Sequence, residues 1–82
     1  MDQTTRIRQF VLSNFYVADP DTLGDDLSLL DQGIVDSTGV LEVIGFIETE
    51  FGIEVRDEEI LPENLDSIAR IAAFVARKRV PA

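Results

Sequence analysis

Hydrophobic residues recur at helical spacing at the start of this 82-residue chain. The pattern predicts a first helix that is capped by Thr4 or Thr5 and ends near Tyr16. Pro20 supports that end, because proline disfavours helix at the residue before it. The apolar face of this helix consists of Ile7, Phe10, Val11 and Phe15. We expect that face to belong to the core.

A second apolar-periodic segment runs from Ser37 to about Phe51 and stops at Gly52, a common helix-ending residue. Ser37 comes directly before the first apolar positions, where its hydroxyl can accept a backbone N–H of the first turn. Leu41, Ile44, Ile47 and Phe51 follow at helical spacing, and Val40, Val43 and Phe46 widen the apolar surface. Part of that surface is therefore expected to be exposed or shared with a partner.

The last third of the chain predicts a short helix followed by a longer one. Asp57 caps the short helix, which runs to about Leu61 and is terminated by Pro62. Before it, the segment 53–55 reads as an extended link that buries Ile53 and Val55. The final helix starts at Asp66 or Ser67 and ends in a basic last turn, where positive charge opposes the helix dipole. Its inward residues are Ile68, Ile71, Ala72 and Val75, with Phe74 alongside.

Residues 17–35 form a long loop rich in turn-forming residues. Six apolar side chains can pin this loop to the helices, and a helical turn is expected around Leu27 to Leu30. They are Leu23, Leu27, Leu29, Leu30, Ile34 and Val35. The whole pattern predicts one domain over residues 1–82: an all-α, small four-helix bundle with three longer helices, a short third helix and a long loop between helices 1 and 2. We expect one core, formed by Phe10, Phe15, Leu41, Ile44, Ile47, Phe51, Ile68, Ile71 and Val75.

Charge narrows the classes of partner. Sixteen acidic against seven basic residues give a formal net charge of −9, which argues against nucleic acid and favours positively charged patches on partner proteins. Between Gln9 and Ala69 the one basic residue is Arg56. No apolar stretch is long enough for a membrane span or a signal peptide, and there is no cysteine, so we expect a cytoplasmic monomer that does not bind membranes.

The sequence lacks the residues that several kinds of catalytic, metal-binding and phosphate-binding site require. Without histidine or cysteine, no Ser-His-Asp or Cys-His catalytic unit can form, and zinc lacks its usual ligands. Asp19, Asp21 and Gly24 match part of a calcium loop, but Leu30 stands where a bidentate glutamate is needed. Glycine-rich phosphate cradles are absent from the sequence, and a bundle this small has little room for a substrate pocket. We expect neither an enzyme nor a metal site.

Ser37 remains as the candidate functional residue. Taken alone, Asp36-Ser37 is most simply a helix cap, but its surroundings favour another interpretation. The chain resembles the acyl carrier and peptidyl (aminoacyl) carrier proteins, of the free-standing type. Four pieces carry this resemblance: Asp36-Ser37, the apolar and acidic helix that ends in Glu48-Thr49-Glu50-Phe51, the segment 53–60 and the segment 62–68. The dipeptide alone is a weak signal. The four pieces in this order, over nearly the whole chain, are specific.

The resemblance implies that Ser37 receives 4′-phosphopantetheine from a phosphopantetheinyl transferase that uses coenzyme A and magnesium. The thiol of the arm then holds an acyl or aminoacyl group as a thioester. A phosphodiester on Ser37 would lie at a helix N-terminus, which favours an anion. Asp36 would contribute to transferase recognition, and partners would dock on Val40, Glu42, Val43 and Glu48. The implied partners also include an adenylating acyl or aminoacyl ligase and downstream condensing or tailoring enzymes.

Two positions depart from the fatty-acid members of that family. They commonly have leucine and then an acid after the serine, where this chain has Thr38 and Gly39. The central helix is also less acidic. The stretch DSTGVLEVIGFIE is similar to carriers that serve adenylating ligases in specialised, non-ribosomal peptide-like biosynthesis, which we favour. The alternatives are a fatty-acid or polyketide acyl carrier protein and, from a different class, an unmodified acidic docking module. The cargo leaves no trace in the sequence.

Overall fold

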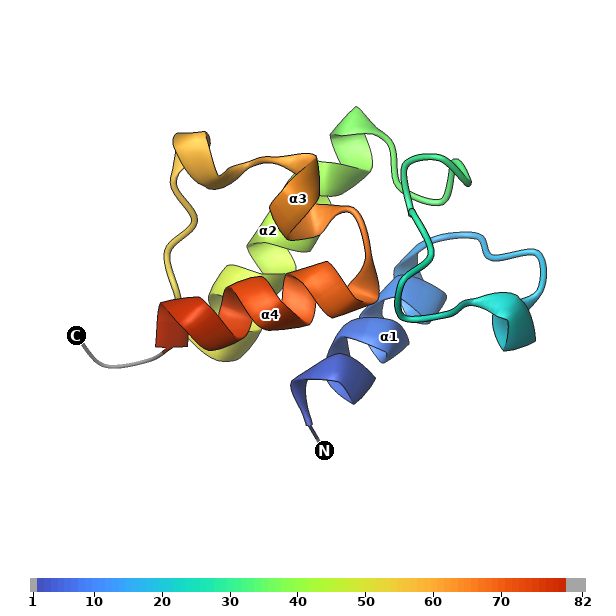
Figure 1. Ribbon diagram of the computed structural model, residues 1–82, viewed down its shortest axis with the longest axis horizontal. Helices are drawn as coiled ribbons and strands as arrows, with labels where there is room; N and C mark the ends of the chain where they lie inside the picture. Colours follow the sequence, from blue (N-terminus) through green and yellow to red (C-terminus); the bar gives the residue numbers. More distant parts are fainter. Residues whose placement is uncertain (1, 80–82) are drawn as a thin grey trace.

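The computed structural model describes residues 2–79, which contain four α-helices and no β-strand (Figure 1). The helices are α1 (Gln3–Asn14), α2 (Ser37–Phe51), α3 (Pro62–Leu65) and α4 (Ile68–Arg79). Two 3₁₀ helices, Pro20–Thr22 and Asp57–Glu59, interrupt the connections. Helix α4 packs against the other three helices. This confirms the predicted all-α bundle with three longer helices, a short third helix and a long first loop.

The core gathers apolar side chains from every α-helix and from the first loop. Of the residues predicted to form it, Ile47, Phe51, Ile68, Ile71 and Val75 are buried. Three others, Phe10, Phe15 and Ile44, are half-buried and pack at its edge. The core also includes Ile7, Val11, Leu23, Leu29, Val35, Val43, Leu65 and Phe74.

The prediction was wrong for Leu41, whose side chain is 66% exposed. The buried face of helix α2 contains Gly39, Val43 and Ile47. Because two residues of an α-helix rotate by about 200°, Leu41 faces away from Val43 and lies on the solvent side of α2. The apolar surface of α2 is thus wider than the stripe it buries.

Helix α1 begins earlier than predicted. Asp2, not Thr4 or Thr5, is its N-cap, and the carboxylate of Asp2 accepts a hydrogen bond from the Thr5 N–H at 2.8 Å. The hydrogen bond to Thr5 lowers the pKa of Asp2 below its ordinary value. The helix ends at Asn14, with Phe15 as C-cap. Aspartate and threonine are both good caps, so the backbone register decided between them.

The long loop is ordered, and close to the expected position it makes a single helical turn, in which the Gln32 N–H donates to the Ser28 carbonyl at 3.1 Å. Residues 29–33 form turns, because the backbone there bonds to the α3–α4 junction. The Leu29 N–H donates to the carbonyl of Asp66 at 2.7 Å, and the Asp66 carboxylate accepts from the Ser28 hydroxyl at 2.7 Å and the Leu30 N–H at 2.9 Å. Asp66 therefore fixes the loop, together with the buried side chains of Leu23, Leu29 and Val35.

Residues 53–65 depart from the prediction at the proline. The expected helix from Asp57 to Leu61 is only the 3₁₀ helix Asp57–Glu59, with Arg56 rather than Asp57 as its cap. Pro62 begins α3 instead of ending a helix. Proline is tolerated in the first helical turn because its missing N–H would be unpaired there anyway. The link before it is extended, and Ile53 and Val55 are half-buried within it.

Helix α4 begins at Ile68, directly after Ser67, which is one of the two residues predicted to start it. The Ser67 hydroxyl accepts from the Arg70 N–H at 3.0 Å, and its carbonyl accepts from the Ile71 N–H at 2.9 Å. Ser67 itself is buried. Within residues 2–79, no helix is both long enough and apolar enough to span a membrane.

Candidate functional site

Ser37 is the first residue of α2, but it is not the cap. That role belongs to Asp36, whose carboxylate accepts from the Gly39 N–H at 2.7 Å while its carbonyl accepts from the Val40 N–H at 2.9 Å. Two capping residues stand side by side in the sequence, and the first of them takes the bond. Ser37 is consequently exposed, and within residues 2–79 its hydroxyl has no hydrogen-bond partner.

The other three serines of the chain are placed differently. The Ser28 hydroxyl bonds to Asp66, and the buried Ser67 hydroxyl accepts from Arg70. Ser13 is exposed but lies in the last turn of α1, where the dipole disfavours a negative group. Ser37 alone combines an uncommitted, exposed hydroxyl with the N-terminus of a long helix.

The first turn of α2 also suits an anion. Asp36 takes the N–H of Gly39, and the N–H groups of Ser37 and Thr38 have no acceptor within the described chain. Unpaired N–H groups and the positive end of the 15-residue helix both favour negative charge at this point. A phosphate ester on the Ser37 hydroxyl fits this environment.

Gly39 explains how this turn is held in place. A Cβ at Gly39 would lie 2.8 Å from Cε1 of Phe15 and 3.2 Å from Cγ1 of Val35. Glycine therefore lets Phe15, after the end of α1, and Val35, at the end of the first loop, pack closely against the first turn of α2. The departure from the fatty-acid pattern at Gly39 has a packing cause.

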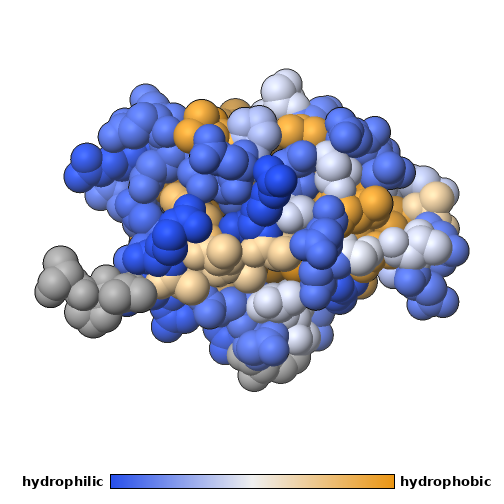
Figure 2. Space-filling view, viewed as in Figure 1, coloured by the Kyte–Doolittle hydropathy of each residue, from blue (hydrophilic) through white to orange (hydrophobic). Residues whose placement is uncertain are grey.

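A surface cavity of about 350 Å³ opens beside Ser37. Three segments build its mostly apolar wall: the end of the first loop, the first turns of α2 and the stretch that leads into α3. The residues are Leu30, Ser37, Val40, Leu41, Ile60, Leu61, Pro62 and Leu65. Figure 2 shows a largely hydrophilic surface with separate hydrophobic areas, some of them along the edge where α2 begins and near α3. Ser37 therefore stands at the rim of an apolar hollow.

The predicted docking residues do not share one surface. The prediction that partners dock on Val43 was wrong, because the side chain of Val43 is 3% exposed and belongs to the core. Val40 is half-buried in the wall of the cavity. The half-buried carboxylate of Glu48 is engaged inside the fold, where it accepts from the Val55 N–H at 2.9 Å. Glu42 is exposed and lies next to the exposed Leu41.

Sequence reasoning missed Leu30, Leu41, Ile60 and Leu61 as members of this surface. Leu30, Ile60 and Leu61 lie between turn-forming residues, in segments where a solvent-exposed chain has no need of large apolar side chains. That excess was the available signal. All three belong to the exposed large hydrophobics of the molecule, with exposed fractions of 36% to 40%.

A polar cluster fixes the outer wall of the cavity. Both Glu59 carboxylate oxygens accept from Lys78 Nζ, at 2.9 and 3.0 Å, and Oε1 also accepts from the Arg56 N–H at 2.9 Å. The Lys78 bond, then the Arg56 bond, hold the pKa of Glu59 below its ordinary value. Asn64 donates to the Glu59 carbonyl and accepts from Arg77, each at 2.9 Å. The basic end of α4 therefore ties down residues 59–64, besides opposing its own dipole.

The acids of residues 2–79 do not build a metal site, since they contain no group of three or more His, Cys, Asp or Glu arranged to hold an ion.

Asp36 gives a first test of the geometry. Asp36→Ala removes the bond to the Gly39 N–H and should lower the free energy of unfolding by about 1 kcal/mol, while Asp36→Asn, which retains a capping oxygen, should lower it far less. Urea unfolding followed by circular dichroism measures both. Equal stability of Asp36→Ala and the wild type would contradict the assignment of Asp36 as the cap.

Comparisons with known proteins concern the same region. Residues 5–75 match the family described as phosphopantetheine attachment site. The chain is 37% identical over 57 residues to a D-alanyl carrier protein of Abiotrophia defectiva, across 70% of this chain and 71% of that relative. It is 32% identical over 74 residues to an acyl carrier protein of Zymomonas mobilis subsp. mobilis, across 90% of this chain and 91% of that relative. The family match includes Ser37 and at least part of every α-helix.

Proposed function

Since this chain belongs to the family of phosphopantetheine attachment domains, we propose that Ser37 is the residue that carries 4′-phosphopantetheine and that the chain presents acyl or aminoacyl groups to partner enzymes. The observation that supports Ser37 most strongly is its exposed, uncommitted hydroxyl at the N-terminus of α2. The bound group would supply a terminal thiol, on which the cargo is held as a thioester.

The residues around Ser37 would support the modification through where they lie in the first turn of α2. Asp36 caps α2 and so leaves the neighbouring hydroxyl free to be modified. The unpaired N–H groups of Ser37 and Thr38 would stabilise the negative charge of the phosphodiester, which lies on its non-bridging oxygens. The apolar cavity next to Ser37 offers contact area to a partner or to the proximal part of the arm. None of these roles requires the chain to catalyse a reaction itself.

The proposal is tested by incubating the purified chain with coenzyme A, Mg²⁺ and a phosphopantetheinyl transferase of broad specificity, and then measuring its intact mass. We expect one phosphopantetheine per chain. The competing function is an unmodified acidic docking module, which would show no added mass under conditions that modify a known carrier.

Among cargoes, we favour an aminoacyl or unusual acyl group, loaded by a separate ATP-dependent adenylating ligase in specialised biosynthesis. The similarity to a D-alanyl carrier protein supports an aminoacyl cargo, and the sparse acids of α2 support a partner surface that relies less on charge. Gly39 carries no weight here, because packing against Phe15 accounts for it. The similarity to an acyl carrier protein keeps a fatty-acid or polyketide role as the alternative.

Loading assays separate the two cargo classes. The phosphopantetheinylated chain is offered to candidate ligases with ATP and amino acids or free acids, and separately to a malonyl-transferring enzyme with malonyl-coenzyme A. We expect the ligase route to load the chain. Efficient malonyl loading, with no loading by any ligase, would support the fatty-acid or polyketide role instead.

The docking surface can be tested by the rate of phosphopantetheine addition. We propose that partners contact Leu41 and Glu42 together with the cavity. Leu41→Asp should slow addition by about tenfold, because it places a charge in the desolvated centre of the contact. Glu42→Gln should have a smaller effect, which weakens further as salt rises. Leu12→Asp, at a leucine 38% exposed on α1, is the control and should retain the wild-type rate. Equal rates for Leu41→Asp and the wild type would remove Leu41 from this surface.

A further inference from the structure

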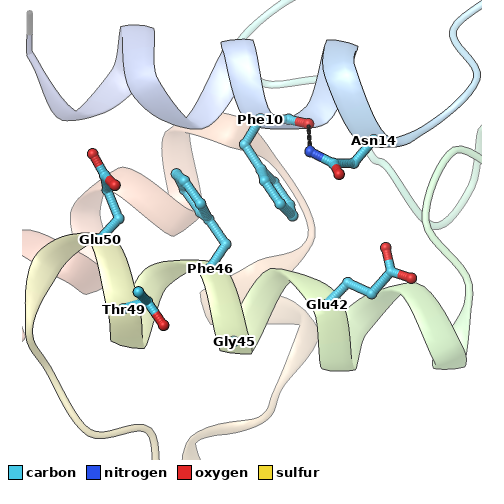
Figure 3. A pocket seen from close by; sticks show the side chains of 7 residues that line it. All are labelled: Phe10, Asn14, Glu42, Gly45, Phe46, Thr49 and Glu50. Carbon is cyan, nitrogen blue, oxygen red and sulfur yellow. Dashed lines mark hydrogen bonds between the residues drawn. The ribbon is translucent and has the colours of Figure 1, made fainter.

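A second cavity, of about 460 Å³, lies between α1 and α2, and Figure 3 shows its side chains. Phe10 from α1 and Phe46 from α2 point toward each other, with ring centroids 4.2 Å apart and planes inclined by 14°. Glu42 stands at one end of the view and Glu50 at the other, with Gly45 between them on α2. We call this cavity the α1–α2 groove.

The groove lies apart from the attachment serine, and Glu42 is the one residue that it shares with the docking surface proposed above. It shares no residue with the cavity beside Ser37. Gly45 is eight residues beyond Ser37, which is about 12 Å along the helix axis. The space next to Gly45 is open, since a Cβ placed on this residue would have no other atom within 4 Å.

The chemistry of the groove suits a flat cation. Glu42 is exposed and has no partner among residues 2–79. Glu50 is paired with Arg6 at 3.1 Å, yet its side chain remains 41% exposed, so it can accept a second donor. The half-buried rings of Phe10 and Phe46 stack on each other between the two carboxylates. The face of each ring that is turned away from the other ring is electron-rich and attracts a cation that stacks on it. A neutral apolar guest would cover Glu42 without compensating its charge.

We propose that the α1–α2 groove binds an arginine side chain presented by a partner protein. Arginine fits better than lysine, because its planar guanidinium can stack on a phenyl ring and bond to carboxylates at its edges at the same time. A protein partner fits better than a nucleic acid or an anionic membrane, since a chain of net charge −9 repels both. The contact is independent of Ser37 and adds a second recognition point, on the side of α2 that faces α1.

The unmodified wild-type chain is suitable for the test. Two-dimensional ¹⁵N NMR follows its titration with acetyl-Ala-Arg-Ala-amide and with the matching lysine and citrulline peptides, because citrulline has the shape of arginine without its charge. We expect saturable shifts at Asn14, Gly45, Phe46 and Thr49 with the arginine peptide, and about fivefold weaker binding of the citrulline peptide. Shifts spread over all the acidic segments, equal binding of the arginine and citrulline peptides, or no saturable shift would overturn the proposal.

Variants distinguish binding in the α1–α2 groove from general attraction to the net negative charge of the chain. Gly45→Leu should fill the open space and abolish the saturable shifts without lowering the melting temperature, since leucine favours helix over glycine. Glu42→Gln should weaken the arginine peptide about fivefold. Glu54→Gln, an exposed acid in the link after α2, removes the same charge and should leave binding unchanged. Equal weakening by Glu54→Gln would mean general charge attraction and would contradict the groove.

The outcome is distinguishable from a failure of the attachment function. The titration uses the unmodified chain and reads the amides of α1 and α2, whereas modification of Ser37 is read by mass. Binding of the arginine peptide without any modifiable serine, or modification without binding, would each reject one proposal and retain the other.

Discussion

Ser37→Ala is expected to abolish the addition of phosphopantetheine completely while leaving the fold intact. The variant removes the proposed attachment oxygen, but no hydrogen bond is lost, because Asp36 caps α2 and the Ser37 hydroxyl has no partner within residues 2–79. Intact mass after incubation with coenzyme A and a transferase measures the modification. Thermal unfolding followed by circular dichroism measures the fold, and the melting temperature should be close to that of the wild type.

The matched control for this variant is Ser13→Ala. Ser13 is also exposed, but it lies in the last turn of α1, so its loss should leave the modification at the wild-type level. A phosphopantetheine that persists on Ser37→Ala would place the attachment on another residue. A folded wild type that is never modified would leave the docking-module function in place of the carrier function.

The second large effect concerns stability. Phe74 in α4 is 2% exposed and is the largest of the fully buried side chains. Phe74→Ala should lower the free energy of unfolding by about 3–5 kcal/mol, which is a large share of the ~5–15 kcal/mol that stabilises a small domain. Chemical unfolding followed by circular dichroism checks this value.

Tyr16→Ala is the control for that truncation. It removes an aromatic ring that is 83% exposed, so its effect should stay within about 0.5 kcal/mol. A loss of less than 1 kcal/mol in Phe74→Ala would contradict the close packing of α4 against the other helices.

Helix α2 shows what the sequence can predict. Its apolar periodicity and the glycine after Phe51 specified the range Ser37–Phe51, and Gly52 adopts the left-handed conformation that ends the helix, with φ of 67°. These signals are local: a repeat along one segment and a residue that tolerates positive φ. Local signals were sufficient for the existence of every long helix.

The face that α2 buries could not be predicted in the same way. Apolar residues occupy more than half of its circumference, so the sequence offers both Leu41 and Val43 as core residues. The neighbouring helices decide, and they cover Val43 and leave Leu41 exposed. The docking prediction failed at Val43 for this reason and not because its chemistry was misread.

Contacts distant in sequence account for the remaining differences. Asp66 bonds to Ser28 and Leu30, 38 and 36 residues away along the chain, and no local pattern announces such a bond. Pro62 is an ambiguous signal, because proline both follows helices and begins them. Asp36 and Ser37 are equally good caps by type, and only the backbone register shows that the serine is the one left free.

Mass spectrometry can test directly whether phosphopantetheine is attached to Ser37 at the start of α2. Tryptic cleavage after Arg8 and Arg56 yields one peptide, Gln9–Arg56, that contains Ser13, Ser28 and Ser37. Fragmentation of this peptide by tandem mass spectrometry, after modification of the wild-type chain, locates the added group. We predict that every fragment carrying the added mass contains Ser37. Added mass on fragments that lack Ser37, or on the peptide that carries Ser67, would contradict attachment at Ser37.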